Sequence, residues 1–464
     1  MADEPAVPYS SLPVQLPVAH VPPANHNLAS ASTILAGHSH QNPRDLVAMG
    51  KEAIKTAIKI DFDKKPWEQA GIHNRWHPDI PFAATVKPGE VFHIQCFDWT
   101  GGQVANDDSA DDIRNLDLNG CHFLSGPVGV DGAEPGDVLV VEIQDIQPFP
   151  DKPWGYTGVL DKEAGPSLLD AYYPEAIKAI WDFEGIFATS RHIPHVKFPG
   201  LIHPGILGTM PSAELLSKWN IREKDIHDHH VEIHSPLMVA RLPQEKGTYA
   251  GNSIDPEKFA KVAKEGARTI PPREHGGNAD IKNLSRGSKA YLPVFVKGAG
   301  LSVGDLHFSQ GDGEISFCGA IEMAGVITLK CSIIKNGVKD FAMNTPMFLP
   351  GPVEAHYGPS RYLTFEGISV DENGKQHFLD AHIAFRQACL QLIEYFKQFG
   401  YSGEQIYLLL SSAPVQAHIA SIVDIPNSCT TIGIPADIFD FDIMPREGKI
   451  EPMDMGSCAY TTTK

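Results

Sequence analysis

Apolar and polar residues alternate along several short runs of the chain, each of which follows a turn rich in Pro, Gly and acidic residues. The runs "KPGEVFHI" (87–94) and "EPGDVLVVEI" (134–143) share this arrangement, and a further set of runs begins at Lys289. Period-two alternation bounded by turn residues predicts β-strands. We therefore expect the first two runs to form hairpins of one β-sandwich or barrel, and the later set to form a second β unit.

Other stretches of the chain have different patterns. Apolar residues recur with helical spacing between Ile383 and Phe396, and Gly400 and Gly403 follow them, which predicts the first of two late helices. A short amphipathic helix is expected over about 45–60. Residues 154–211 are irregular and rich in Gly, Pro and aromatic residues, so we expect long loops there.

These patterns divide the chain into five segments. They are a flexible extension (1–43), a first β unit (44–211), a polar insertion (212–268), a second β unit (269–380), and a helical hairpin with a C-terminal tail (381–464). The predicted fold is therefore mainly β, with two β-sandwich or jelly-roll-like units and a late helical hairpin, α+β overall.

Charge and cysteine usage narrow the class of protein. The 464 residues carry a formal net charge of −19, which argues against a nucleic acid or an anionic membrane as partner. No apolar run is long enough to span a bilayer and no secretory signal is recognised, so a cytoplasmic location is expected. The seven cysteines are scattered singly. This distribution favours free thiols in a reducing compartment, with a catalytic thiol as the weaker alternative.

The stretch "GDLHFSQGDGEISFCGAIE" (304–322) places polar residues inside a strand pattern. Asp305 and His307 are two residues apart, so on a strand they share one face at a spacing of about 6.5–7 Å. Asp312 lies between two glycines, and Glu314 follows it. The set suits either a metal site or general acid–base chemistry. A plain "GDGE" hairpin turn with a structural histidine is the alternative.

A second polar cluster, "PPREHGGNADIKNLSRGS" (271–288), immediately precedes the second β unit. It contains almost no apolar residues, so it cannot be a core strand. We expect it to fold over the second β unit, because catalytic groups often lie on loops beside a rigid sheet. The histidines of the stretch 225–234 could chelate a metal, but the polar and charged surroundings favour a solvated segment over a metal site.

These motifs resemble the formamidase/acetamidase family. The likeness runs from about residue 60 to about 443, and the stretches that carry it include "IHNRWHPDIP", "FDWTGGQVANDDSA", "PPREHGGNADIK" and "GAGLSVGDLHFSQGDGEISFCGAIEMAG". The resemblance implies a jelly-roll-like β-sandwich, a homo-oligomer (a trimer or hexamer) and hydrolysis of formamide to formate and ammonia. Some relatives cleave acetamide or a cyclic lactam, so both activities stay open as alternatives.

An amide carbonyl is a poor electrophile, so its hydrolysis needs an activated water and a stabilised oxyanion. On this basis the predicted metal set, for zinc or calcium, is His275, Asp280, Asp305 and His307. The predicted catalytic set is Glu314 as general base, His307, Asp312 as an orienting group and Lys282. The predicted substrate-binding set is Asn278 as carbonyl donor, with Lys282 as its alternative, together with Gln310 and Trp181. If no metal is required, Glu314 and His307 activate the water alone. We expect no organic cofactor.

A non-enzymatic alternative is a jelly-roll module that uses the same Asp, His and Glu residues for a calcium-dependent sugar contact. The loop "REHGGNADIK" argues against this reading, because a lectin site has no evident use for its mixture of Lys, His and Asp. The sequence therefore favours an amidohydrolase that acts on a small amide.

Overall fold

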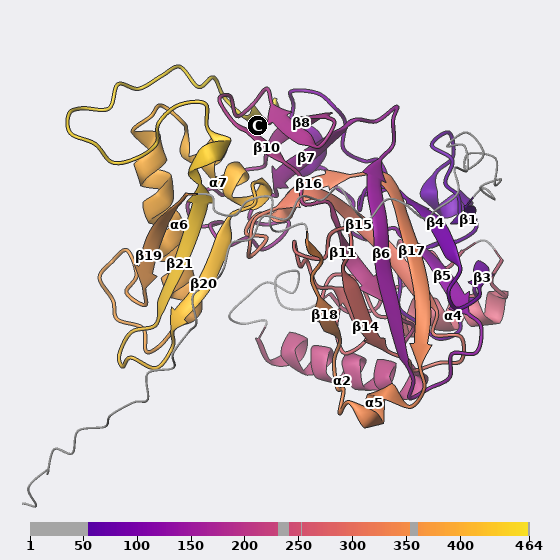
Figure 1. The fold of residues 1–464 in the computed structure, drawn as a ribbon. Helices are drawn as coiled ribbons and strands as arrows, with labels where there is room; N and C mark the ends of the chain where they lie inside the picture. Colours follow the sequence, from indigo (N-terminus) through magenta and orange to yellow (C-terminus); the bar gives the residue numbers. More distant parts are fainter. Residues whose placement is uncertain (1–53, 231–240, 252, 353–360, 463–464) are drawn as a thin grey trace, which may run out of the picture. The chain divides into compact units, whose positions relative to one another are not determined.

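β-Strands make up most of the regular structure in the computed structural model, which describes residues 54–230, 241–251, 253–352 and 361–462 (Figure 1). The extension expected over 1–43 lies outside the described residues. The prediction of a mainly β chain is confirmed. Within the described ranges, no helix is both long enough and apolar enough to cross a membrane.

Two large sheets carry the fold. The smaller of the two has, in spatial order, β1 (Lys55–Ile58), β4 (Val91–Cys96), β17 (Gly325–Ile334), β6 (Val138–Pro148), β14 (Lys289–Pro293) and β18 (Met347–Leu349). The main path of the larger sheet has, in order, β10 (Lys197–Pro199), β9 (Phe187–Ser190), β8 (Ile177–Glu184), β7 (Trp154–Val159), β16 (Phe317–Met323), β15 (Leu301–Gln310), β11 (His203–Gly208), β13 (Gly276–Asn278) and β12 (Pro272–Arg273). Strand β5 (Leu124–Val130) pairs with β15, β2 (Ile72–His73) and β3 (Ala84–Val86), while β22 (Ala459–Tyr460) pairs with β8.

The chain pairs its strands differently from the predicted succession of two β units. Strands β4 and β6 from the first segment flank β17 from the second, and β7 from the first segment pairs with β16 from the second. Both sheets contribute to one hydrophobic core, which includes Phe92 and Val141 of one sheet and Val303 of the other. Residues Ile54–Lys464 accordingly form a single compact unit. Local periodicity indicates strands but not their partners.

Two local predictions are wrong for a related reason. The expected helix over about 45–60 is contradicted at its C-terminal end, where Lys55–Ile58 forms β1 and pairs in parallel with β4. The expected loops over 154–211 contain the five strands β7 to β11. In both stretches tertiary pairing supplies the order that the local pattern does not show.

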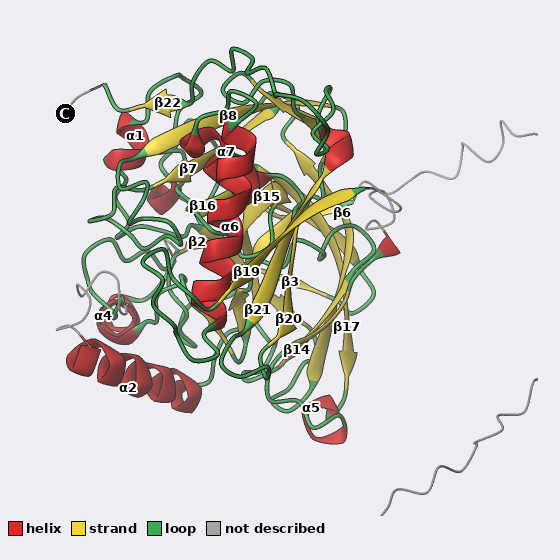
Figure 2. Cartoon of the chain, turned by 90° about the vertical axis from the view of Figure 1, so that its left-hand side faces the viewer, coloured by secondary structure: helices red, strands yellow, loops and turns green. Residues whose placement is uncertain are grey.

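The predicted helical hairpin is confirmed. Helix α6 (Ala381–Lys397) begins where the side chain of Asp380 accepts a hydrogen bond from the Ile383 N–H, and α7 (Gly403–Ser412) begins after a capping box at Ser402. Helix α6 packs on a third sheet, β19 (Tyr362–Ile368), β21 (Cys429–Pro435) and β20 (Gln416–Ser421), as Figure 2 shows.

The remaining helices are found within the polar insertion and the connections. They are α1 (Asp111–Arg114), α2 (Ala213–His230), α4 (Pro256–Glu265) and α5 (Gly337–Asp340), with short 3₁₀ turns at Pro66–Glu68 and Ala436–Ile438. The described part of the segment expected as a polar insertion thus contains the two helices α2 and α4.

Candidate active site

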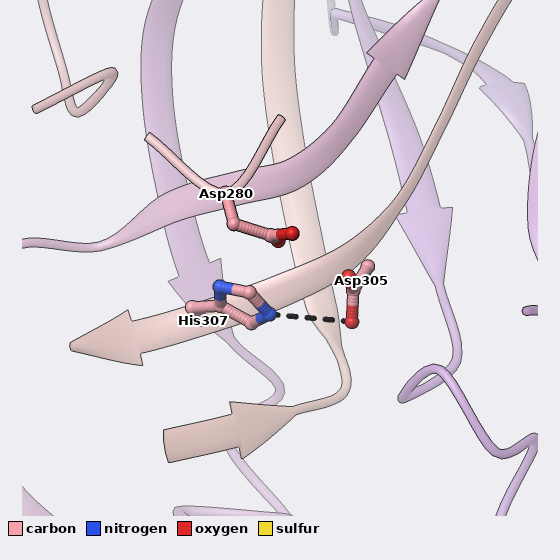
Figure 3. A group of neighbouring side chains, drawn as sticks. All are labelled: Asp280, Asp305 and His307. Atoms are coloured by element: carbon pink, nitrogen blue, oxygen red, sulfur yellow. Dashed lines mark ion pairs between the residues drawn. The ribbon is translucent and has the colours of Figure 1, made fainter. Parts of the chain in front are cut away.

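Strand β15 and the segment after β13 bring three potential metal ligands together (Figure 3). Asp305 and His307 lie on one face of β15, while Leu306 and Phe308 are fully buried in the core, as the alternation predicts. Asp280 reaches this face from the segment after β13. One ligand atom from each of Asp280, Asp305 and His307 lies within 4.8 Å of the others, and His307 Nε2 is 3.2 Å from Asp305 Oδ1.

Two neighbouring strands add side chains that the sequence reasoning missed. Glu322 on β16 lies directly opposite His307 in the strand register, and its Oε2 is 3.1 Å from His307 Nε2. His203 on β11 is the register partner of His307 on the other side. The available signal for Glu322 was a carboxylate inside the otherwise apolar run "FCGAIEM", which has no structural use unless it has a buried partner.

Gln310 organises the cluster from the end of β15. Its Oε1 accepts a hydrogen bond from His307 Nδ1 at 3.0 Å and lies 2.9 Å from His203 Nε2, while its Nε2 donates to the Asp280 carbonyl oxygen at 2.7 Å. The polar atoms of Gln310 are therefore engaged with the protein, which makes it a positioning residue rather than a direct substrate contact.

The cluster holds more carboxyl groups than it can ionise. Burial raises the pKa of Glu314 and of Glu322 to about 8, and burial beside Glu314 raises the pKa of Asp280 well above its usual value. Burial opposes a charge on His307, but Glu322 and Asp305 outweigh it and raise its pKa well above the usual value. Burial likewise raises the pKa of Asp305, and His307 more than offsets this, so the net shift is downward. Without a bound cation, the stable arrangement is a His307–Asp305 ion pair, with protons neutralising the other acids.

The backbone at this site is strained. Asp280, Asp305 and Glu314 have positive φ angles of 47°, 56° and 44°, a region that residues other than glycine rarely adopt. Strained conformations persist where the surrounding structure holds them, and they gather at functional sites. Three of them within one acid cluster therefore support a functional role for it.

The cluster borders a cavity of about 530 Å³. Glu314 and Asp280 line it together with Asn278, and apolar side chains such as Ile270 and Phe385 form much of the wall. The Asn278 Nδ2 donates to the Ile270 carbonyl oxygen at 2.9 Å, whereas Asn278 Oδ1 has no hydrogen-bond partner among the described residues. A small amide entering the cavity would therefore meet carboxyl groups and an unpaired acceptor.

The same residues fit a divalent cation. Asp280 Oδ1 is buried and without a hydrogen-bond partner among the described residues. A Cβ atom at Gly205 on β11 would come within 2.6 Å of Asp280 Oδ1 and 2.7 Å of Asp305 Oδ2, so glycine there keeps open the space that these ligands face. Two carboxylates and one imidazole suit zinc better than calcium, which prefers oxygen ligands alone.

Two predicted site residues lie elsewhere. His275 is fully buried between Trp76 and Trp219, at ring-centroid distances of 4.5 and 4.6 Å, and does not belong to the group of potential ligands. Trp181 does not line the cavity, because it faces the core and its indole N–H donates to Thr157 Oγ1 at 3.1 Å. Neither position could be predicted from the sequence, because the alternation along a strand does not show which of its sides faces a cavity.

The predicted catalytic residues Lys282 and Asp312 contact each other next to the site but outside the cavity lining. Lys282 Nζ forms an ion pair with Asp312 Oδ1, and Asp312 Oδ2 accepts the Ala417 N–H at 2.9 Å. Neither residue lines the cavity. Through these contacts the glycine-flanked turn that contains Asp312 and precedes Glu314 is tied to the segment after β13 and to β20.

The cysteines are all free, as predicted. Cys318 and Cys331 are fully buried, and burial raises the pKa of both thiols, that of Cys331 to about 12. Such thiols stay protonated at neutral pH, so the structure gives no support to the alternative of a catalytic thiolate.

A mainly β chain that buries a carboxylate–imidazole cluster beside a cavity has the architecture of a water-activating hydrolase. Residues 59–441 match the Acetamidase/Formamidase family, and this chain belongs to that family. It is 62% identical over 412 residues to a putative formamidase of Schizosaccharomyces pombe, with 89% of this chain and 100% of that protein covered. It is 56% identical to a formamidase of Methylophilus methylotrophus, with 84% and 95% covered. The solved structure of a gamma lactamase from Delftia acidovorans is 51% identical, with a TM-score of 0.83 and coverage of 88% and 100%.

Proposed function

We propose that this protein is a formamidase that hydrolyses formamide to formate and ammonia. Two relatives that carry the formamidase name cover most of the chain at 62% and 56% identity. The observation that carries the proposal is structural: Glu314 and Asp280 face one cavity from a buried cluster that also holds His307 and Asp305. Amide hydrolysis needs a group that activates water, and a carboxylate that lines the cavity can do so.

In the proposed mechanism Glu314 is the general base, acting in the ionised form that a pKa of about 8 leaves partly populated near neutral pH. Its carboxylate accepts a proton from a water molecule while the water oxygen bonds to the amide carbon. The C–N bond then breaks, and Glu314 returns the proton to the departing nitrogen, so that one amide and one water yield formic acid and ammonia. General acid–base catalysis of this kind contributes about 10²- to 10⁴-fold to the rate.

The other groups position the reactants. Asn278 Oδ1, which has no partner among the described residues, accepts a hydrogen bond from the substrate NH₂ group. The Asp305–His307 pair supplies a fixed charge arrangement behind the cavity, and Gln310 holds His307 in place. Lys282 and Asp312 keep the turn before Glu314 in position.

A divalent metal, with zinc favoured over calcium, would be held by Asp280, Asp305 and His307. When bound, it would act as a Lewis acid toward an oxygen ligand. Elemental analysis of the purified protein, and turnover before and after dialysis against a chelator, test this part. Stoichiometric zinc and recovery on zinc addition are expected, and full activity of a metal-free protein would contradict it.

Ammonia release from formamide and from acetamide, together with ring opening of a small lactam to its amino acid, tests the substrate. We expect formamide to give the highest kcat/KM. A second candidate is a lactam, because the solved relative with 51% identity is named a gamma lactamase and the cavity of about 530 Å³ exceeds what the three heavy atoms of formamide require. A higher kcat/KM for the lactam would replace formamide with it as the preferred substrate.

The family resemblance also supports three further proposals: a jelly-roll-like arrangement, a homo-oligomer such as a trimer or hexamer, and a cytoplasmic location. Native mass spectrometry measures the subunit count directly, and a monomer would contradict the proposed assembly.

A further inference from the structure

Several polar residues of the cavity, His122 among them, have no role in the mechanism described above. His122, two residues before β5, lines the same cavity as Glu314, Asp280 and Asn278 and is only 7% exposed. Its ring lies against Trp99, with ring centroids 5.2 Å apart, so its orientation is fixed by packing. No described residue accepts or donates a hydrogen bond at His122 Nε2, although the side chain faces the cavity.

The neighbouring hydroxyl determines which ring nitrogen carries the proton. Thr269 Oγ1 accepts the backbone N–H of His122 at 2.8 Å and lies 3.1 Å from His122 Nδ1. A threonine hydroxyl has one hydrogen to donate, and among the described residues Nδ1 is its acceptor. Donation to Nδ1 is the arrangement that gives the hydroxyl hydrogen an acceptor, and it leaves the ring proton on Nε2.

We infer that His122 is a catalytic residue of the amide hydrolysis, whose Nε2–H donates a hydrogen bond to the carbonyl oxygen as it becomes an oxyanion. This inference rests on the proposed function. The carboxyl groups of the cluster accept protons or repel negative charge, so they are poorly suited to stabilise the developing oxyanion. A hydrogen-bond donor elsewhere in the cavity lining is needed for that. Burial lowers the pKa of His122 and so favours the neutral imidazole. In that form the single ring proton, on Nε2, is the hydrogen that can be donated. Fixed donors of this kind are among the largest contributions to acyl-transfer catalysis.

The role predicts a graded series of variants. His122→Ala removes the donor and is expected to lower kcat by about 10²- to 10³-fold, the usual effect of losing one oxyanion donor, with KM changed much less. His122→Gln keeps an N–H near the Nε2 position and is expected to retain at least about a tenth of the activity. Thr269→Val frees the ring tautomer and is expected to lower kcat by about tenfold, which marks Thr269 as a positioning residue.

A second His–Thr pair provides a matched control. His93 Nδ1 lies 2.9 Å from Thr328 Oγ1 in the smaller of the two large sheets, and neither residue lines the cavity. His93→Gln and Thr328→Val are expected to leave kcat within about twofold of the wild type. If His122→Ala also stays within threefold while formamide is hydrolysed normally by the wild type, the inference is overturned and the proposed function stands.

A spectroscopic measurement tests the tautomer without turnover. Nitrogen-15 labelling of the 21 histidines, with the His122 signals assigned by their loss in His122→Gln, reports which nitrogen is protonated. A protonated Nε2 and a bare Nδ1 are expected, and the reverse assignment would overturn the inference even if His122→Ala fails to fold. If the wild type neither releases ammonia from formamide or acetamide nor opens the lactam ring, the proposed function fails, and the catalytic role of His122 fails with it.

Discussion

Strands β15 and β17 are both ten residues long and both have antiparallel neighbours on each side, but they bury different chemistry. All ten residues of β15 are buried, including Asp305, His307 and Gln310. Strand β17 buries apolar side chains such as Ile327 and Leu329, and its Lys330 reaches the surface.

The difference in buried side chains indicates a different role for each strand. Apolar burial along β17 is favourable by itself, at about 25 cal/mol for each Å² removed from water. Burial of a carboxylate and an imidazole costs free energy unless each has a partner. Strand β15 meets this cost through Glu322, Gln310 and the segment that carries Asp280. A strand that served only packing would not need these residues.

The largest expected effect separates chemistry from packing. Glu314→Gln keeps the size of the side chain but removes the base, so kcat for formamide should fall about 10³-fold while the unfolding temperature changes little. The matched change is Glu142→Gln on β6, whose carboxylate faces Lys330 of β17 at 3.7 Å. It should leave kcat unchanged, and near-normal turnover of Glu314→Gln would remove Glu314 as the base.

A methyl group tests the space inside the cluster. Gly205→Ala places a Cβ within 2.6 Å of Asp280 Oδ1 and of His307 Cε1, so the ligands must shift and kcat should fall about 10²-fold. Gly433→Ala on β21 is the control, because its new Cβ would come no closer than 3.0 Å to any neighbour, Thr364 Oγ1, and would lie 3.5 Å from Tyr362. Equal losses of activity in the two variants would mean that general sheet distortion, rather than the cluster, causes the effect.

The ion pairs beside the two strands differ in burial. The Lys282 side chain is 6% exposed and pairs with Asp312, whereas Lys330 is 38% exposed and pairs with Glu142. Lys282→Met should lower the free energy of unfolding by about 2 kcal/mol, because it leaves Asp312 without its cation. Lys330→Met should change it by no more than about 0.5 kcal/mol. Chemical denaturation measures both, and similar values would show that burial does not distinguish the pairs.

The smallest expected effect is on the pH dependence of stability, and it involves Asp137, which pairs with Lys335 just after the end of β17. Burial raises the pKa of Asp137, but Lys335 and the N–H groups of Glu134 and Asn336 outweigh it, so the net shift is downward. A lowered folded pKa gives stability above the ordinary value of 3.8 that is lost as the pH falls through the folded pKa. Asp137→Asn should therefore lower the free energy of unfolding by about 1 kcal/mol at pH 7, and the difference should shrink below about pH 4. A pH-independent difference would contradict this linkage.

Part of the site was accessible from sequence. The alternation along 304–310 predicted that Asp305 and His307 share a face. In the structure His307 Nε2 lies 3.2 Å from Asp305 Oδ1. The polar segment 271–288 was expected to fold over the second β unit, and Asp280 does reach the face of β15. Glu322, His203 and His122 were missed because each enters the site through pairing or packing with residues distant in sequence.

The sequence by itself determined the mainly β composition, the helical hairpin at 381–412 and the face of β15 that carries the acid and the imidazole, because periodicity and capping are local properties of the chain. Only the tertiary structure decided that Glu322 and His203 flank His307, that His275 lies between two tryptophans, and that both β segments share the same sheets. Strand register and partner choice depend on contacts across the whole chain, and a change of register by one residue would move every side chain of a strand to the other face.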